Sequence, residues 1–181
     1  DWITVVTPGI AMGFVQERTD LQVRYAPSFS RYADRDDQDF TAHSAGLTFG
    51  QDLFQGLRFN LSDTYLKSND PLEDPQNLQG LRQTRSKYWT NITDANFSYV
   101  FGAENRVNAG YRYNIYENDQ ITLDDSKIQS PYANLTYWLD VQNGAEVTYS
   151  YTDAQYSRDD NFLAESDYTA NSAGMRYLRR F

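Results

Sequence analysis

The most constraining feature of the sequence is a two-residue alternation at residues 106–116 (RVNAGYRYNIY). Its odd positions carry apolar or aromatic side chains, and its even positions include Asn108, Gly110, Arg112 and Asn114. Successive side chains of a β-strand point to opposite faces, so this pattern predicts a strand with one apolar and one polar face. A strand of a soluble protein with one buried face and a strand of a membrane barrel share this signature, so the rest of the chain must decide between these two classes.

The same unit recurs along the chain, and we expect nine strands in one domain covering residues 1–181. The connections between them alternate in length. Short turns are expected near residues 17–20, 52–56, 102–105 and 141–144, and long loops near 33–39, 67–86, 117–129 and 157–167. Asn143-Gly144 in the last short turn is a strong hairpin dipeptide.

Short turns on one rim and long loops on the other are the plan of an outer-membrane barrel. Aromatic residues also gather at the predicted strand ends, where such barrels carry girdles; they are Trp2, Tyr32, Tyr65, Trp89, Phe101, Tyr116, Tyr137 and Tyr156. The sequence therefore predicts an all-β fold, an antiparallel up-and-down transmembrane β-barrel. A soluble β-sandwich or solenoid is the alternative.

Composition narrows the function classes. No stretch approaches the roughly 20 apolar residues of a membrane helix. This does not exclude membrane-spanning β-strands, because only every second residue of such a strand needs to be apolar. The chain has no Cys, which excludes a disulfide framework and a thiolate metal site. Its net charge of −9 argues against nucleic acid as a partner.

The strand count carries a further expectation. Single-chain bacterial barrels have an even number of strands with both termini on the short-turn side. The first predicted strand starts on the long-loop side, so we expect at least one strand before Asp1 and interpret the chain as a mature or trimmed segment of a larger barrel. Missing strands or other chains would complete it, because an open edge in lipid leaves unpaired N–H and C=O groups.

Three stretches carry a resemblance to a known family: residues 1–9 (DWITVVTPG), 19–29 (TDLQVRYAPSF) and 61–75 (LSDTYLKSNDPLEDP). They resemble the β-barrel porin 2 group of Gram-negative outer-membrane proteins, whose members are often associated with exopolysaccharide gene clusters. The resemblance covers about the first 75 residues, and the remainder matches by pattern. Residues 174–181 (GMRYLRRF) also resemble a barrel assembly signal with a terminal Phe, except that Arg179 stands where an apolar residue is usual.

The charged residues give the candidate site. Four arginines lie on the predicted polar face toward the short-turn rim, namely Arg24, Arg58, Arg112 and Arg176. They would form a basic band in the lumen, while acidic loops crowd the opposite rim through Asp36, Asp37, Asp39, Asp124, Asp125, Asp159 and Asp160. One interpretation is a field that guides anionic solutes or polysaccharide. The other is that the arginines pair with the lumen acids Asp94 and Glu146 and simply fill the interior.

Catalysis and metal binding find little support. The only histidine, His43, is expected on the outward face without a defensible Ser or Asp partner. Asp34 and Asp36 fit the start of a calcium loop, but Asp39 stands where that loop needs Gly and no Glu closes it, so we favour a solvated acidic surface. We therefore expect no enzyme activity, metal or cofactor.

The predicted function is passage of solute or exopolysaccharide through a polar pore in the bacterial outer membrane. The expected partners are the lipid bilayer and lipopolysaccharide, together with an anionic polysaccharide. A structural barrel that anchors acidic surface loops to a partner is the competing hypothesis within the membrane class.

Overall fold

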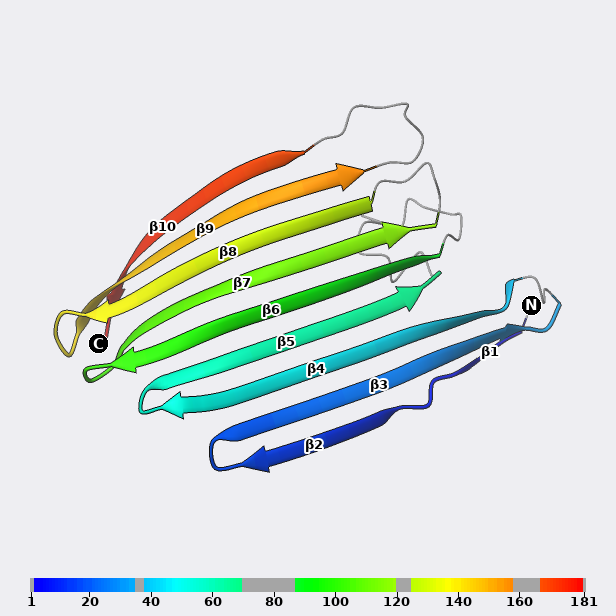
Figure 1. Cartoon of the computed structure of the whole chain (residues 1–181), viewed down its shortest axis with the longest axis horizontal. Coiled ribbons are helices and arrows are strands. Elements are labelled where there is room, and N and C mark those ends of the chain that lie inside the picture. The colour runs from blue at the N-terminus through cyan, green and yellow to red at the C-terminus, as the bar shows by residue number, and fades with distance from the viewer. Residues whose placement is uncertain (1, 35–37, 70–86, 120–124, 158–166, 181) are drawn as a thin grey trace.

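The structure is a computed structural model that describes residues 2–34, 38–69, 87–119, 125–157 and 167–180. These residues form one antiparallel sheet of ten strands (Figure 1). The strands are β1 (Ile3–Val6), β2 (Ile10–Gln16), β3 (Thr19–Tyr32), β4 (Phe40–Phe54), β5 (Leu57–Ser68), β6 (Tyr88–Phe101), β7 (Asn105–Asn118), β8 (Asp125–Trp138), β9 (Asn143–Ser157) and β10 (Tyr168–Arg179). Among the described residues, no helical segment has the length and apolarity needed to cross a membrane.

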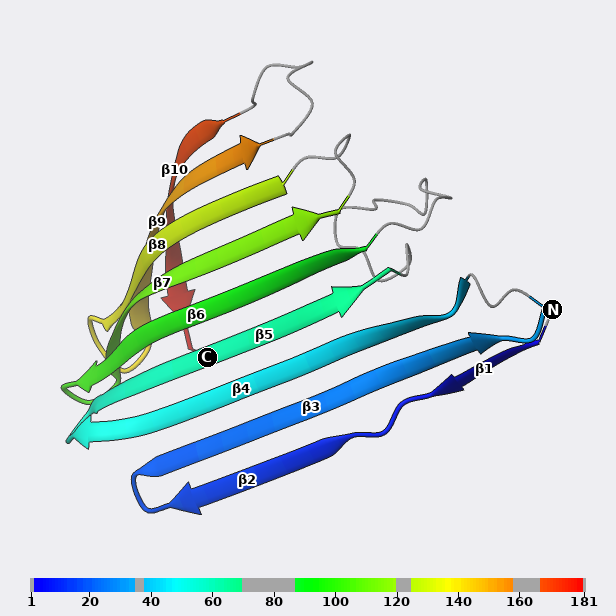
Figure 2. The ribbon, with the colours of Figure 1, turned by 45° about the vertical axis from the view of Figure 1, so that its right-hand side comes forward.

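The strands follow one another across the sheet in chain order, except that β1 and β2 both pair with β3 (Figure 2). The sheet is not closed, and its two edges are β1 with β2 on one side and β10 on the other. Because every pair is antiparallel and eight steps separate β2 from β10, the two edge strands run in the same direction.

The first expected strand is divided in two, which accounts for ten strands in place of nine. β1 and β2 share one register on β3, with Val6 opposite Phe29 and Ile10 opposite Tyr25. Continuing that register across the gap places Pro8 opposite Pro27. Neither proline has an N–H group, so neither can donate to the ladder at this point and the strand is interrupted.

Four short connections lie at one end of the sheet, which we call the short-turn rim; they are residues 17–18, 55–56, 102–104 and 139–142. Gly56 and Gly102 adopt positive φ angles of 84° and 61° there, a conformation that glycine enters without steric cost. The opposite end is the long-loop rim. One expected loop was too long, because β7 continues to Asn118 and β8 begins at Asp125, so the connection is 119–124 and Asp125 belongs to a strand.

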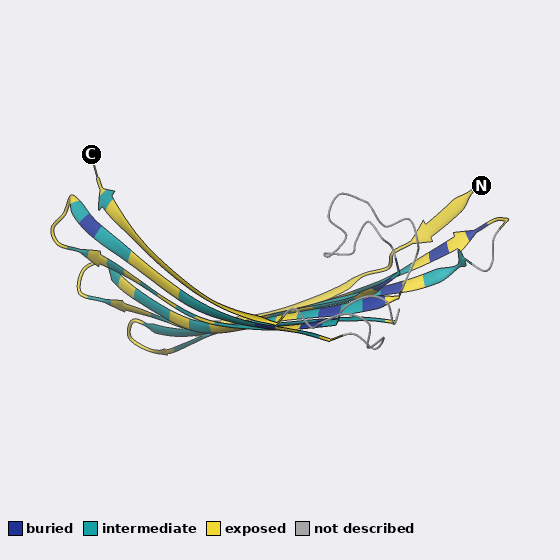
Figure 3. Ribbon diagram, turned by 90° about the horizontal axis from the view of Figure 1, so that it is seen from above, coloured by how far each residue is buried: buried dark blue, intermediate teal, exposed yellow. Residues whose placement is uncertain are grey.

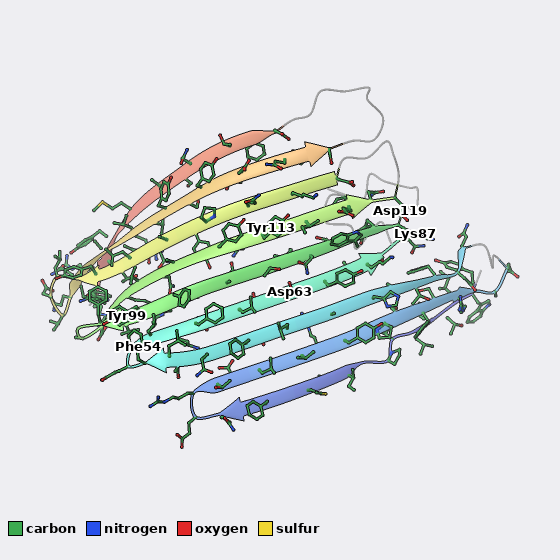
Figure 4. The ribbon with its side chains drawn as sticks, viewed as in Figure 1. Phe54, Asp63, Lys87, Tyr99, Tyr113 and Asp119 are labelled. Carbon is green, nitrogen blue, oxygen red and sulfur yellow. The ribbon has the colours of Figure 1, made fainter. Side chains whose placement is uncertain are left out.

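The sheet is bent into a trough (Figure 3), and its two faces differ in an unusual way. The residues classed as buried all lie on the polar face, as expected on the inner side of a curved sheet where side chains converge: Ser30, Tyr32, Ala42, Ser68, Tyr88, Thr90, Tyr116, Ser126 and Ala154. The opposite, apolar face carries Tyr99 and Tyr113 and is exposed (Figure 4). Large side chains on it include Met12 at 67% exposure, Phe97 at 49% and Met175 at 81%.

Candidate functional site

The polar face divides into a charged and an uncharged half. Within the described strands, every charged residue of this face lies between the short-turn rim and the Asp94–Arg112 pair at mid-height: Asp20, Arg24, Asp52, Arg58, Asp94, Arg106, Arg112, Glu146 and Arg176. Five of these are cations and four are anions, which leaves a net charge of +1. The long-loop half of the same face consists of Ser, Thr, Ala, Asn, Tyr and a few aliphatic residues. We call the first region the charged half.

Arg58 is held by two carboxylates. Its guanidinium forms an ion pair with Asp52 on the adjacent β4 at 2.8 Å and a second one with Asp20 on β3, two strands away. Its Nε also donates to the Oδ1 atom of Asn60 at 3.0 Å. Gly50 lies beneath the cluster, and a Cβ atom there would collide with the Arg58 guanidinium. The missing side chain therefore lets one arginine bridge three strands.

Asp94 is the centre of a second cluster. It accepts hydrogen bonds from Arg112 at 3.1 Å, from the Tyr132 hydroxyl at 2.8 Å and from the Asn96 amide at 3.1 Å. The Tyr132 ring lies across Gly110, where a Cβ atom would come within 2.6 Å of the ring. Tyr132 is a lining residue that the sequence alone does not reveal, because the Gly110–Tyr132 pairing requires the register between β7 and β8.

Arg176 forms an ion pair with Glu146 at 2.9 Å on the adjacent strand. Beyond it, Arg180 pairs with Glu104 across the short-turn rim and its guanidinium lies 3.8 Å from the centre of the Trp138 ring. The pKa of Glu104 is lowered, chiefly by its hydrogen bond with Arg180. Both lumen acids predicted from the sequence, Asp94 and Glu146, thus contact one of the predicted arginines.

Arg24 differs from the other three predicted arginines. With the part of the chain that the structure describes it forms neither an ion pair nor a side-chain hydrogen bond. It lies over Gly46, where a Cβ atom would be 2.5 Å from its Nε atom. It lines a groove of about 430 Å³ whose other polar-face residues include Gln22, Thr48, Ser62 and Thr64. These side chains are uncharged. The lining also includes Asp63 of the apolar face, which bonds Thr93 and Asn91 and does not pair with Arg24, so the groove contains one arginine and one carboxylate that are not in contact.

The four arginines do not form one ring. Their distances from the short-turn ends of their strands differ: five residues for Arg24 from Thr19, one for Arg58 from Leu57, seven for Arg112 from Asn105 and three for Arg176 from Arg179. The charged half is therefore a broad lining with alternating signs, and its unpaired cations among the described strand residues are Arg24 and Arg106.

The acidic residues at the long-loop rim have a repeated structural role. Asp39 accepts a hydrogen bond from the Tyr32 N–H at 2.8 Å, and Asp125 accepts one from the Asn118 N–H at 2.8 Å. Asp167, which the site prediction did not single out, accepts one from the Tyr156 N–H at 2.7 Å. In each case an aspartate at the start of the returning strand bonds the end of the outgoing strand, an arrangement we call the aspartate clasp.

Asp39 also forms an ion pair with Arg31 at 3.0 Å. The remaining predicted loop acids, Asp36, Asp37, Asp124, Asp159 and Asp160, lie outside the described residues. Over the described ranges, no group of three or more His, Cys, Asp or Glu side chains is arranged to hold a metal ion.

A line of polar contacts crosses the apolar face. The Tyr25 hydroxyl bonds His43 Nδ1 at 2.7 Å, the Tyr111 hydroxyl bonds Gln129 at 2.7 Å and the Tyr149 hydroxyl bonds Asn171 at 2.7 Å. Between the first two, Asp63 accepts hydrogen bonds from Thr93 at 2.6 Å and from Asn91 at 3.1 Å. Each contact joins the two strands of one long-loop hairpin.

These contacts share one height, which we call the tyrosine line. Tyr25, Asp63, Tyr111 and Tyr149 each lie six residues from the short-turn end of their strand, at Thr19, Leu57, Asn105 and Asn143. Between this line and the short-turn rim, the strand residues of the apolar face that the structure describes carry no charge until Arg179. Asp63 is therefore at the boundary of the apolar surface (Figure 4), as is His43 through its contact with Tyr25.

A scan against models of protein families and a search of curated proteins found no match to this chain.

Proposed function

We propose that this chain is the wall of an outer-membrane β-barrel with a polar, water-filled lumen through which a solute or an exopolysaccharide passes. The observation that carries the proposal is the inverted distribution of side chains. The apolar face is exposed and uncharged over a continuous band, whereas the curved inner face holds the ion pairs. A soluble sandwich would bury its apolar face against a second layer.

The size of the apolar band supports a membrane location. On β7, where apolar and aromatic side chains continue past the tyrosine line, it runs from Val107 to Ile115, eight residue steps or about 27 Å along the strand. In a strand tilted by about 40°, that length spans about 21 Å of membrane, close to the ~25 Å band of outer-membrane barrels. Aromatic residues flank the band near the short-turn rim, where Phe54, Tyr99 and Phe101 contact one another in series.

The open edges bear on the number of strands. In lipid, each unpaired backbone group costs several kcal/mol, so both edges require a partner strand. Direct pairing of β10 with β1 and β2 would be parallel, because the two edges run in the same direction. We propose that further antiparallel strands pair with the edges and complete the barrel, which fits the resemblance to the β-barrel porin 2 group.

A second candidate is an anchoring barrel without a conducting lumen. It is favoured by the ion pairs of Arg58, Arg112 and Arg176, which cross-link the inner face and reduce its field. In this case the aspartate clasps would hold surface loops for a partner. The groove at Arg24 favours the pore, because Arg24 has no ion-pair partner among the described residues and lies beside neutral hydroxyl groups on the polar face, where a cation attracts anions.

Conductance in a planar lipid bilayer tests both candidates. The pore predicts stable channels that prefer anions, and Arg24→Gln should shift the reversal potential in a salt gradient toward cation preference. Lys127→Gln is the matched control, because Lys127 lies on the apolar side of β8 near the long-loop rim. Stable bilayer insertion with no conductance would refute the pore and leave the anchoring barrel. A protein that stays monodisperse without detergent would refute both.

A further inference from the structure

Basic residues gather on the apolar side of the sheet at the long-loop rim. Arg31, His43, Lys67 and Lys87 line a pocket of about 310 Å³, together with Thr41, Asn69 and Asp39. The register brings them together from four strands or strand ends, with His43 directly opposite Lys67 on the neighbouring strand. Four basic side chains in one pocket are exceptional in a chain whose net charge is −9.

The pocket keeps most of its positive charge. Among the described residues that line it, the one acid is Asp39, which pairs with Arg31 at 3.0 Å and accepts a hydrogen bond from the Tyr32 N–H at 2.8 Å. Lys67 and Lys87 form no ion pair with the residues whose placement is described, and both are exposed. Lys87 projects at the start of β6 (Figure 4). Two acids lie near Lys87 outside the pocket lining: Glu117 accepts a hydrogen bond from the Trp89 indole at 3.0 Å, and the Asp119 N–H donates to the Lys87 carbonyl oxygen at 2.9 Å (Figure 4).

The position of the pocket relates it to the apolar band. Lys67 lies four residues beyond Asp63 toward the long-loop rim, and Arg31 lies six residues beyond Tyr25. Arg31 and Lys67 are thus just outside the tyrosine line and His43 lies on it, all on the face that would contact lipid. His43 uses Nδ1 for the Tyr25 hydroxyl, which leaves Nε2 available to a ligand.

We infer that this pocket binds the phosphate-bearing headgroup of a lipid in the leaflet next to the long-loop rim. The inference rests on the proposed membrane location. Lys and Arg bind phosphate oxygens through charge-assisted hydrogen bonds, and basic groups beside an apolar surface select lipids whose headgroups are anionic. The acyl chains of such a lipid would lie against the apolar band below the pocket. Thr41 and Asn69 add uncharged hydrogen-bonding groups suited to the sugar or glycerol part of the headgroup.

Native mass spectrometry in a neutral detergent tests the inference with defined probes. The first probe is an acylated disaccharide lipid with two phosphomonoesters, and the second is the same lipid without phosphate. We expect the phosphorylated lipid to bind at least tenfold more tightly. Lys67→Gln with Lys87→Gln should weaken it about 30-fold, since each basic residue near a charged membrane surface changes affinity about fivefold. Lys127→Gln is the control and should leave the affinity within twofold of the parent.

Further arms separate the possible outcomes. Inorganic pyrophosphate that displaces the lipid at micromolar concentration would overturn the lipid as ligand and indicate a free phosphate site. Equal binding of both lipids, or full binding by the double variant, would overturn the pocket itself. Selective binding by a protein that inserts into bilayers but shows no conductance would support this inference while refuting the pore.

Discussion

The contact between Gly110 and Tyr132 makes the sharpest prediction about the charged half. A Cβ atom at Gly110 would be 2.6 Å from the Tyr132 ring and 2.7 Å from Asn96 Cβ. Gly110→Ala must therefore displace the ring from which the hydroxyl donates to Asp94 at 2.8 Å. The perturbation adds one methyl group and removes one hydrogen bond.

The expected cost follows from these two effects. Overpacking costs about 1–3 kcal/mol, and losing a hydrogen bond to a charged acceptor costs about 1.5–3 kcal/mol. The lower entropy of the unfolded chain returns about 0.4–1 kcal/mol when glycine becomes alanine. The net loss of stability should be about 3 kcal/mol. Gly13→Ala is the matched control, because it lies on the same face and nothing lies within 4 Å of its added Cβ.

Urea unfolding in detergent micelles, followed by tryptophan fluorescence, measures both variants. In the Tyr132→Ala background the two contacts with the Tyr132 ring and hydroxyl are removed and the Asn96 contact remains, so Gly110→Ala should cost about 1 kcal/mol there. Equal stability of Gly110→Ala and Gly13→Ala would refute the packing argument. An unchanged cost in the Tyr132→Ala background would show that the ring is not the group that resists the methyl.

Three further predictions concern the rims. Asp39→Ala should speed hydrogen exchange at the Tyr32 amide at least tenfold and leave the Asn118 amide unchanged, because each clasp has its own aspartate; parallel acceleration at both amides would contradict local action. The pKa of Asp140 is lowered by a hydrogen bond from the Asn143 side chain and then by those from the Gln142 and Asn143 N–H groups. The Asp140 carboxylate therefore contributes its full stabilisation above the unfolded pKa near 3.9, and this stabilisation is lost as the pH falls through the lower folded pKa. Asp140→Asn should flatten the dependence of stability on pH below about pH 4, and an unaltered slope would exclude this role. Gly56→Ala should destabilise the protein by about 1–3 kcal/mol, because Gly56 has a φ of 84° and an added Cβ would collide with the Val100 carbonyl oxygen; thermal unfolding that matches the parent would show that the turn adapts.

The alternation along the sequence predicted the strands because the period of two fixes which side chains share a face. It did not predict the break at Pro8, since that break depends on Pro27 standing opposite it in the register. It also missed the start of β8. Its outward residues Lys127 and Gln129 are polar, so the alternation disappears there while the strand continues.

The charged residues were predicted to lie on one face, and their partners could be predicted only in part. Arg58 pairs with Asp20, which is 38 residues away in the chain, and no local pattern indicates this. The pairs of Arg112 with Asp94 and Arg176 with Glu146 match one of the two interpretations of the sequence. Arg24 has no charged partner among the described residues because its neighbours on β4 and β5 are Gly46 and Thr64, a consequence of register alone.

The tyrosine line also measures how the strands are inclined. Following the register from Tyr25 leads to Ile115 on β7 and to Gln155 on β9, whereas the line passes through Tyr111 and Tyr149. The line therefore descends four residues over four strands and six residues over six. One residue is about 3.4 Å and one strand spacing about 4.8 Å, which gives an angle of about 35°. If the line is parallel to the membrane surface, the strands lean by that angle from the membrane normal, as in closed barrels. Each strand would then occupy about 5.9 Å of circumference, and the sheet from β2 to β10 would supply about 50 Å of barrel wall.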